Sequence, residues 1–142
     1  MKRILLLALI LLAAGCAGAP AKPERSCWHD DANIENEIGY CQALRSGNTL
    51  YISGVTGSGA MPDAVRKVYR NLEAILKAHG LTFADVVKEN VYARDLDAFI
   101  ASKDIRKEFY GETFPAATWL QVQRMYLPQF VVEVELTAQF PG

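Results

Sequence analysis

The chain has 142 residues, with 15 lysines and arginines against 16 aspartates and glutamates, and a formal net charge of −1. Lys2 and Arg3 belong to a removable leader, and their loss leaves 13 basic against 16 acidic residues, a net charge of about −3. The remaining body has the size of one ordinary domain. It carries no cluster of basic residues of the kind that binds nucleic acid, so we expect no nucleic-acid partner.

The first residues form a targeting segment. Met1, Lys2 and Arg3 make a positive start, and residues 4–14 are an apolar run too short to span a bilayer. Residues 12–16 (Leu-Ala-Ala-Gly-Cys) resemble a bacterial lipobox, in which Cys16 is lipidated after cleavage. The alternatives are cleavage after Ala19 or an uncleaved anchor. We predict a lipid-anchored protein of the cell envelope, facing the periplasm or the exterior.

These features divide the chain into residues 1–15 as a lipoprotein signal peptide, 16–36 as the lipidated cysteine and a tether, and 37–142 as one domain. In an oxidising compartment, Cys27 and Cys41 either form a disulfide or remain two free thiols. The sequence has no zinc-ligand spacing and no glycine-rich phosphate loop, so we expect neither a metal nor a cofactor.

Hydrophobic periodicity predicts the elements of the domain. Apolar residues that alternate or cluster predict the strands, and an apolar stripe that includes Val65, Val68 and Leu72 predicts a long helix. Strict alternation of apolar and polar residues around Glu133 predicts the last strand. In chain order we expect strands at 42–45 and 49–53, a glycine-containing loop at 54–61, a helix from 62 to about 80, a strand at 86–93, a helix at 96–110, and strands at 117–124 and 130–139.

This order predicts an α+β domain in which two helices cover one face of a mixed sheet. The other face of the sheet then needs a different cover, and oligomerisation is one solution.

Several short motifs follow one another along the domain: Ile38-Gly39-Tyr40-Cys41-Gln42, Leu50-Tyr51-Ile52-Ser53-Gly54, the helix at 65–80, the strand and Asp-Leu at 86–96, Phe114-Pro115-Ala116, and Glu133-Val134-Glu135. In this order they resemble the motifs of the Rid family (reactive intermediate deaminases, also called YjgF proteins). The resemblance covers about residues 37–138. It implies the Rid fold (chorismate-mutase-like) as a single domain, assembled as a homotrimer with clefts between the subunits.

The resemblance also implies a chemistry. Family enzymes bind a 2-imino or enamine acid in the cleft, add water to the C=N carbon, and release ammonia and a 2-oxo acid. By position, the matching site residues are Tyr40, Ser53, Ala117, Trp119 and Glu133.

This chain departs from the family at Ala117. Members that hydrolyse 2-imino acids usually read Phe-Pro-Ala-Arg-Ser, and arginine's planar fork suits a substrate carboxylate. Ala117 supplies no donor. Arg124 lies an odd number of residues away, so on a regular strand it points to the opposite face and does not replace the arginine.

The remaining candidates are assigned to two roles. Glu133 and Ser53 are the predicted catalytic residues, and Tyr40, Ala117, Trp119 and Gln121 the predicted substrate-binding residues. Trp119 and Gln121 share the strand parity of Ala117. The Trp119 ring either fills the space left by the arginine or forms the wall of a reshaped pocket. The structural alternatives are an exposed or salt-bridged carboxylate for Glu133, a turn hydroxyl for Ser53 and an aromatic packing residue for Tyr40.

The sequence therefore predicts an exported, deaminase-like hydrolase of small imines or enamines with an altered substrate site. The alternatives are a non-catalytic trimer that binds a small molecule in its intersubunit clefts, and a structural trimer whose clefts are shut by Trp119.

Overall fold

The computed structural model describes residues 24–142 of the chain. The predicted signal peptide at 1–15 and the predicted lipidation site Cys16 lie outside the described residues. Among residues 24–142, no helix is long and apolar enough to cross a membrane.

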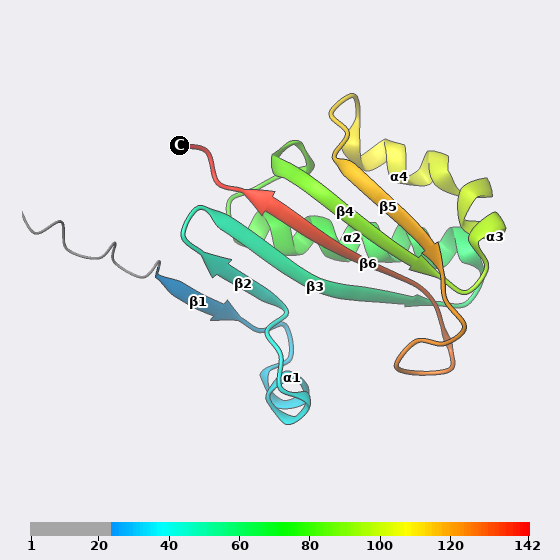
Figure 1. Cartoon of the computed structure of the whole chain (residues 1–142), viewed down its shortest axis with the longest axis horizontal. Coiled ribbons are helices and arrows are strands. Elements are labelled where there is room, and N and C mark those ends of the chain that lie inside the picture. The colour runs from blue at the N-terminus through cyan, green and yellow to red at the C-terminus, as the bar shows by residue number, and fades with distance from the viewer. Residues whose placement is uncertain (1–23) are drawn as a thin grey trace, which may run out of the picture.

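Six strands and four helices make up the described chain (Figure 1). In chain order they are β1 (Arg25–Trp28), α1 (Ala32–Ile38), β2 (Ala43–Ser46), β3 (Thr49–Ser58), α2 (Met61–Ala78), the 3-10 turn η1 (Phe83–Asp85), β4 (Val86–Ala93), α3 (Leu96–Ala101), α4 (Lys103–Tyr110), β5 (Ala116–Gln121) and β6 (Phe130–Gln139).

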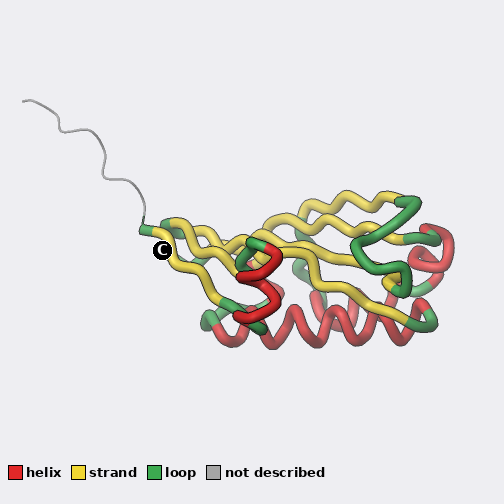
Figure 2. The backbone as a smooth tube through the Cα atoms, turned by 90° about the horizontal axis from the view of Figure 1, so that it is seen from below, coloured by secondary structure: helices red, strands yellow, loops and turns green. Residues whose placement is uncertain are grey.

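The strands form one mixed sheet in the order β1-β2-β3-β6-β4-β5. All neighbours are antiparallel except β4 and β5, which are parallel. The helices α2, α3 and α4 lie on one face of this sheet (Figure 2). The opposite face is called the open face below. The α+β architecture predicted from the sequence is confirmed.

The core fills the space between α2 and the central strands. Val65, Val68 and Leu72 of α2 are fully buried, as are Val132 and Val134 of β6. The helical stripe and the strand alternation meet there because each presents one apolar face to the other. Consequently Glu133, between the two valines, points to the open face.

The predicted tether extends too far along the chain, because residues 25–38 are folded. β1 pairs with β2 as an edge strand, and Asp31 begins α1 by accepting hydrogen bonds from the backbone N–H groups of Asn33 and Ile34. α1 ends at Gly39, whose φ of 91° favours glycine. These short elements carry little apolar periodicity, so the pattern in the sequence did not indicate them.

Three other boundaries differ from prediction. The expected loop at 54–61 is mostly strand, because β3 runs on to Ser58 through an irregularity between Ile52 and Val55. The expected helix at 96–110 is broken at Ser102 into α3 and α4. β5 ends at Gln121, so Arg124 lies in the following loop and strand parity says nothing about its direction.

Candidate functional site

A cavity of about 600 Å³ lies where β3 and β6 meet α1 and the loop that precedes β6. Its apolar walls come from α1, from that loop and from the first residue of β6, and its polar groups come from β3, from β6 and from Tyr40 before β2. Its lining residues are Ile34, Ile38, Tyr40, Ser53, Gly54, Thr56, Tyr126, Leu127, Phe130 and Glu133. We call it the Glu133 cavity, because Glu133 is the only charged residue among the described residues that line it.

Glu133 enters this cavity over a glycine. A Cβ atom added to Gly54 would lie 1.9 Å from Glu133 Oε1, so only glycine leaves room for the carboxylate. Burial, and after it the charge of Glu135, raise the pKa of Glu133 above its usual value. No hydrogen bond to the Glu133 carboxylate is found among residues 24–142, so its oxygens remain free to accept one from a ligand or water.

Ser53 and Tyr40 complete the polar part of the cavity. The Ser53 hydroxyl donates to the backbone carbonyl of Cys41 at 2.7 Å, so it offers the cavity only its acceptor lone pairs. Burial, and after it the charges of Glu35, Asp30 and Asp31, raise the pKa of Tyr40, which therefore keeps its hydroxyl proton. The structure thus brings together Tyr40, Ser53 and Glu133 from three separate segments of the sequence.

The other predicted site residues lie on β5, at the sheet edge, with β4 between them and β6. Within one chain none of them lines the Glu133 cavity. Ala117 is exposed and pairs with Glu89 across the ladder. The Gln121 side-chain oxygen accepts from the backbone N–H of Leu96 at 3.1 Å.

Trp119 points into the helix layer. Its ring lies edge-on against Phe99 of α3, with 5.1 Å between the centroids, and its Nε1 donates to Glu89 at 3.2 Å. The indole thus packs beneath the sheet, away from Tyr40 and the Glu133 cavity.

Glu89 is the centre of a second polar site that sequence reasoning missed. Its carboxylate is fully buried and accepts from Tyr69 and Tyr110 hydroxyls at 2.8 Å each, from Arg106 Nε at 2.7 Å and from Trp119. Burial, and after it the charge of Glu89, raise the pKa of both tyrosines, so both stay protonated donors. We call these five residues the Glu89 cluster.

The sequence held a signal for this cluster. Glu89 shares strand parity with Val91 and Ala93, two buried positions of β4, and Arg106 and Tyr110 lie one helical turn apart. A glutamate on the buried face of a strand requires partners, because an unpaired charge is costly to bury. Here the Arg106 guanidinium neutralises it and lies 4.5 Å from the Tyr110 ring centroid.

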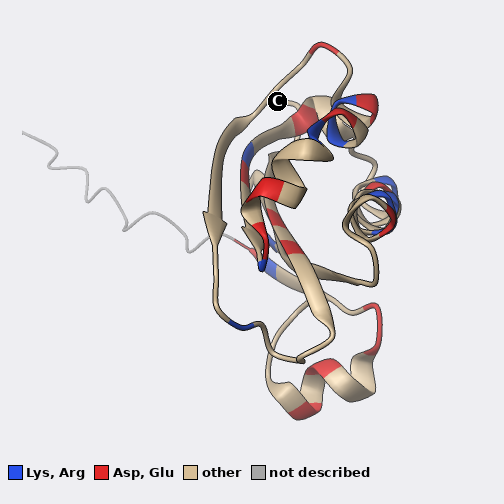
Figure 3. Ribbon diagram, turned by 90° about the vertical axis from the view of Figure 1, so that its right-hand side faces the viewer, with Lys and Arg blue, Asp and Glu red and all other residues tan. Residues whose placement is uncertain are grey.

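Cys27 and Cys41 are joined by a disulfide, with their Cα atoms 5.5 Å apart. Together with His29 they are the single set of metal-type donors gathered among residues 24–142. The disulfide removes the two thiolates that a metal would need, so we assign no metal site. Lysines and arginines alternate with acidic residues along α2 and α4, and α1 carries acidic residues without basic ones (Figure 3).

Known proteins resemble this chain in sequence and in structure. Residues 31–140 match the family described as Endoribonuclease L-PSP. A RutC family protein of Pyrococcus horikoshii is 37% identical over 117 residues, which cover 75% of this chain and 91% of that protein. The chain belongs to the Rid (YjgF) family.

Other Rid relatives extend the comparison to named activities and solved folds. The human 2-iminobutanoate/2-iminopropanoate deaminase is 34% identical over 92 residues, 58% of this chain and 67% of that protein. The crystal structure of a YjgF/YER057c/UK114 family member from Mycobacterium tuberculosis superposes with a TM-score of 0.76 at 27% identity, covering 82% of this chain and all of that one. The Rid fold predicted from the sequence motifs is confirmed.

Proposed function

We propose that this Rid protein hydrolyses small, apolar imines or enamines that lack a carboxylate, with Glu133 as the acid–base group. The observation that carries the proposal is a half-buried carboxylate without a hydrogen-bond partner among the described residues, standing in a cavity with aromatic and aliphatic walls. A carboxylate kept unpaired in this way is typical of a functional site.

The reaction adds water to the C=N bond. Ionised Glu133 accepts a proton from the water as its oxygen bonds to the imine carbon, and passes that proton to the nitrogen. The hydroxyl proton of the resulting carbinolamine then reaches the nitrogen by the same route, and ammonia leaves as the carbonyl forms. Ser53 offers a second acceptor for the attacking water. The raised pKa of Glu133 suits this exchange, because a base works best with a pKa closer to the working pH.

The substrate class follows from the charges of the site. A 2-imino acid brings a carboxylate next to Glu133, in a cavity that no lysine or arginine of residues 24–142 lines. Ala117 offers no donor either. Leaving a buried charge without its partner typically costs about 2–5 kcal/mol. The apolar walls, which include Ile34, Ile38 and Phe130, favour a substrate with an apolar group, and the Glu133 carboxylate favours an uncharged or cationic one.

We further propose a homotrimer in which β5 of one subunit approaches the Glu133 cavity of the next. This arrangement brings Ala117 to the cavity from a neighbouring chain. It also covers Tyr51 and Leu120, which lie on the open face and are 49% and 50% exposed in the single chain.

Lipidation of Cys16 would place this trimer on a membrane of the cell envelope, as the leader sequence predicts.

The test is ammonia release from two freshly generated imines, the imine of acetophenone and 2-iminopropanoate. We expect the wild-type protein to favour the uncharged aryl imine and Ala117→Arg to gain at least about tenfold on 2-iminopropanoate, as a bidentate arginine–carboxylate pair implies. Ala116→Arg is the matched control, since Ala116 is its exposed neighbour on β5. Binding of the aryl imine without ammonia release would instead identify a non-catalytic binding protein.

A further inference from the structure

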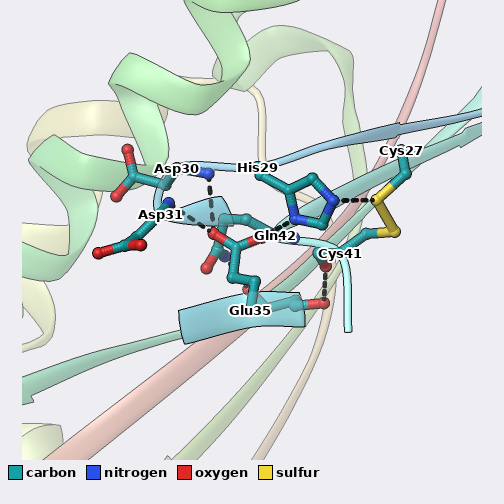
Figure 4. Close-up of a disulfide and its surroundings, with 8 residues drawn as sticks. Cys27, His29, Asp30, Asp31, Glu35, Cys41 and Gln42 are labelled. Carbon is teal, nitrogen blue, oxygen red and sulfur yellow. Dashed lines mark hydrogen bonds and ion pairs between the residues drawn. A yellow bond between two sulfur atoms is a disulfide. The ribbon is translucent and has the colours of Figure 1, made fainter. Parts of the chain in front are cut away.

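The disulfide between Cys27 and Cys41 lies next to His29 and Glu35, an acid–base pair that the proposed hydrolysis does not use. Cys27 is exposed on β1, and Cys41 is partly buried just before β2. Nε2 of His29 lies 3.1 Å from Cys27 Sγ, and Nδ1 of the same ring lies 2.6 Å from Glu35 Oε2 (Figure 4). Sulfur, imidazole and carboxylate therefore stand in a row.

Glu35 fixes the orientation of the imidazole. Its side chain is 2% exposed and also accepts hydrogen bonds from the backbone N–H groups of Asp30, Asp31 and Gln42. Burial raises the pKa of Glu35, but these hydrogen bonds and the one from His29 outweigh it and hold the pKa below its usual value. An ionised Glu35 keeps the N–H on Nδ1, so the Nε2 lone pair faces the sulfur.

That lone pair has no strong partner while the disulfide is closed, because a disulfide sulfur carries no proton. In the reduced protein the same position holds the Cys27 thiol. Nε2 is then placed to take the thiol proton, giving a thiolate beside an imidazolium that Glu35 stabilises in turn. Thiolates beside a histidine cation are the reactive form of cysteine in proteins.

We propose that Cys27 and Cys41 form a redox-active site that exchanges with small thiols, with His29 as its acid–base group and Glu35 as the residue that positions His29. An external thiolate attacks Sγ of Cys41, the S–S bond breaks, and its electron pair goes to Cys27, whose thiolate is stabilised by protonated His29. A second thiol molecule then attacks the mixed disulfide, so that two thiols are oxidised to one small disulfide as the protein pair is reduced.

The other charged groups around this site do not supply an alternative base. Asp30 and Asp31 precede α1, and the Asp31 carboxylate is engaged in capping that helix. Tyr40 stands next to Cys41, and its raised pKa keeps its hydroxyl protonated. Arg45 of β2 pairs with Ser26 in the ladder, and its guanidinium lies over the Phe140 ring. His29 is therefore the group whose protonation bears directly on Cys27.

The first test measures the pH dependence of Cys27 alkylation in the full chain, reduced and kept in EDTA, by iodoacetamide and peptide mass mapping. We expect the wild-type thiol to react at pH 6.5 about tenfold faster than in His29→Gln, because ordinary thiols have a pKa of about 8.5. His79→Gln is the matched control, since that ring packs against Trp28 of β1 and bonds to the Ile75 carbonyl. Equal profiles in the wild-type and His29→Gln proteins would overturn the proposal.

The second test follows disulfide opening by glutathione at pH 6.5. The wild-type and His79→Gln proteins are expected to open about tenfold faster than His29→Gln, with Glu35→Gln between them. A disulfide that glutathione leaves closed in the wild-type protein, under conditions that open unfolded protein, would also overturn it. Circular dichroism of each variant separates loss of reactivity from loss of fold.

Discussion

Two carboxylates stand on opposite faces of the same sheet, and they differ in burial and in hydrogen bonding. Glu89 faces the helices, is fully buried and accepts four hydrogen bonds, one of them from the guanidinium of Arg106. Glu133 faces the open side, is half-buried, and no described residue donates to it. It lies over Gly54, which has no side chain to meet its carboxylate.

Glu89 therefore carries a structural charge, whereas the Glu133 charge is available to a ligand or water. The charge of Glu89 is neutralised where it lies, and the donors that surround it leave no room for a ligand. Glu133 is desolvated without compensation, and a water or substrate that enters its cavity supplies the missing partner. Trp119 belongs to the first site through its Nε1, which explains how a large ring is accommodated beside Ala117 without filling the Glu133 cavity.

Substitution of each carboxylate by its amide should separate the two sites most strongly. Glu89→Gln leaves the Arg106 charge buried without a counter-charge, and we expect a loss of about 3–5 kcal/mol in the free energy of unfolding. Glu133→Gln removes an uncompensated charge, and we expect no loss of stability. Urea denaturation measures both. Equal destabilisation by the two substitutions would mean that Glu133 has a structural partner.

Gly54→Ala tests the space reserved for the Glu133 carboxylate. The added methyl group would lie 1.9 Å from Oε1, so the carboxylate or the strand must move. We expect a cost of about 1–3 kcal/mol, typical of overpacking, together with loss of ammonia release. In the double variant Gly54→Ala, Glu133→Ala the stability cost should disappear, because the clashing atoms are gone. A cost that persists in the double variant would place the strain in the backbone.

Glu35 is a third carboxylate, and its contribution to stability depends on pH. Hydrogen bonds hold its pKa in the folded protein below the usual 4.5, so its contribution to stability is full above about that pH. The contribution is lost as the pH falls from there through the folded-state pKa. We expect the wild-type protein to lose more stability than Glu35→Gln between neutral pH and pH 3. Parallel pH profiles for the two proteins would show that the hydrogen bonds to Glu35 do not favour its ionised form.

The fold was predictable where periodicity is strong. The stripe of α2 and the alternation of β6 each match a buried face residue by residue, and the bounds of β4 and β6 agree with prediction. β1 and α1 were missed because an exposed edge strand and a short helix held by Asp31 and Gly39 carry almost no apolar pattern. The continuation of β3 was missed because its glycines indicate a loop, whereas Gly54 is there to admit Glu133.

The candidate site was predictable only in part. Motif positions identified Tyr40, Ser53 and Glu133, which line one cavity. They did not show that Trp119 turns toward the helices. Strand parity tells which residues share a face of the sheet, but not which face the helices cover. The contacts of His29 with Cys27 and Glu35 depend on a turn conformation that residue types alone do not specify.

The most direct test of Glu133 as the reacting group is ammonia release from the imine of acetophenone by the wild-type and Glu133→Gln proteins. We expect the substitution to reduce the rate at least about 100-fold, the lower range for loss of a general acid–base group, while the unfolding midpoint stays unchanged or rises. A Glu133→Gln protein that releases ammonia as fast as the wild type would contradict the account. In that case the unpaired carboxylate would not be the group that activates water.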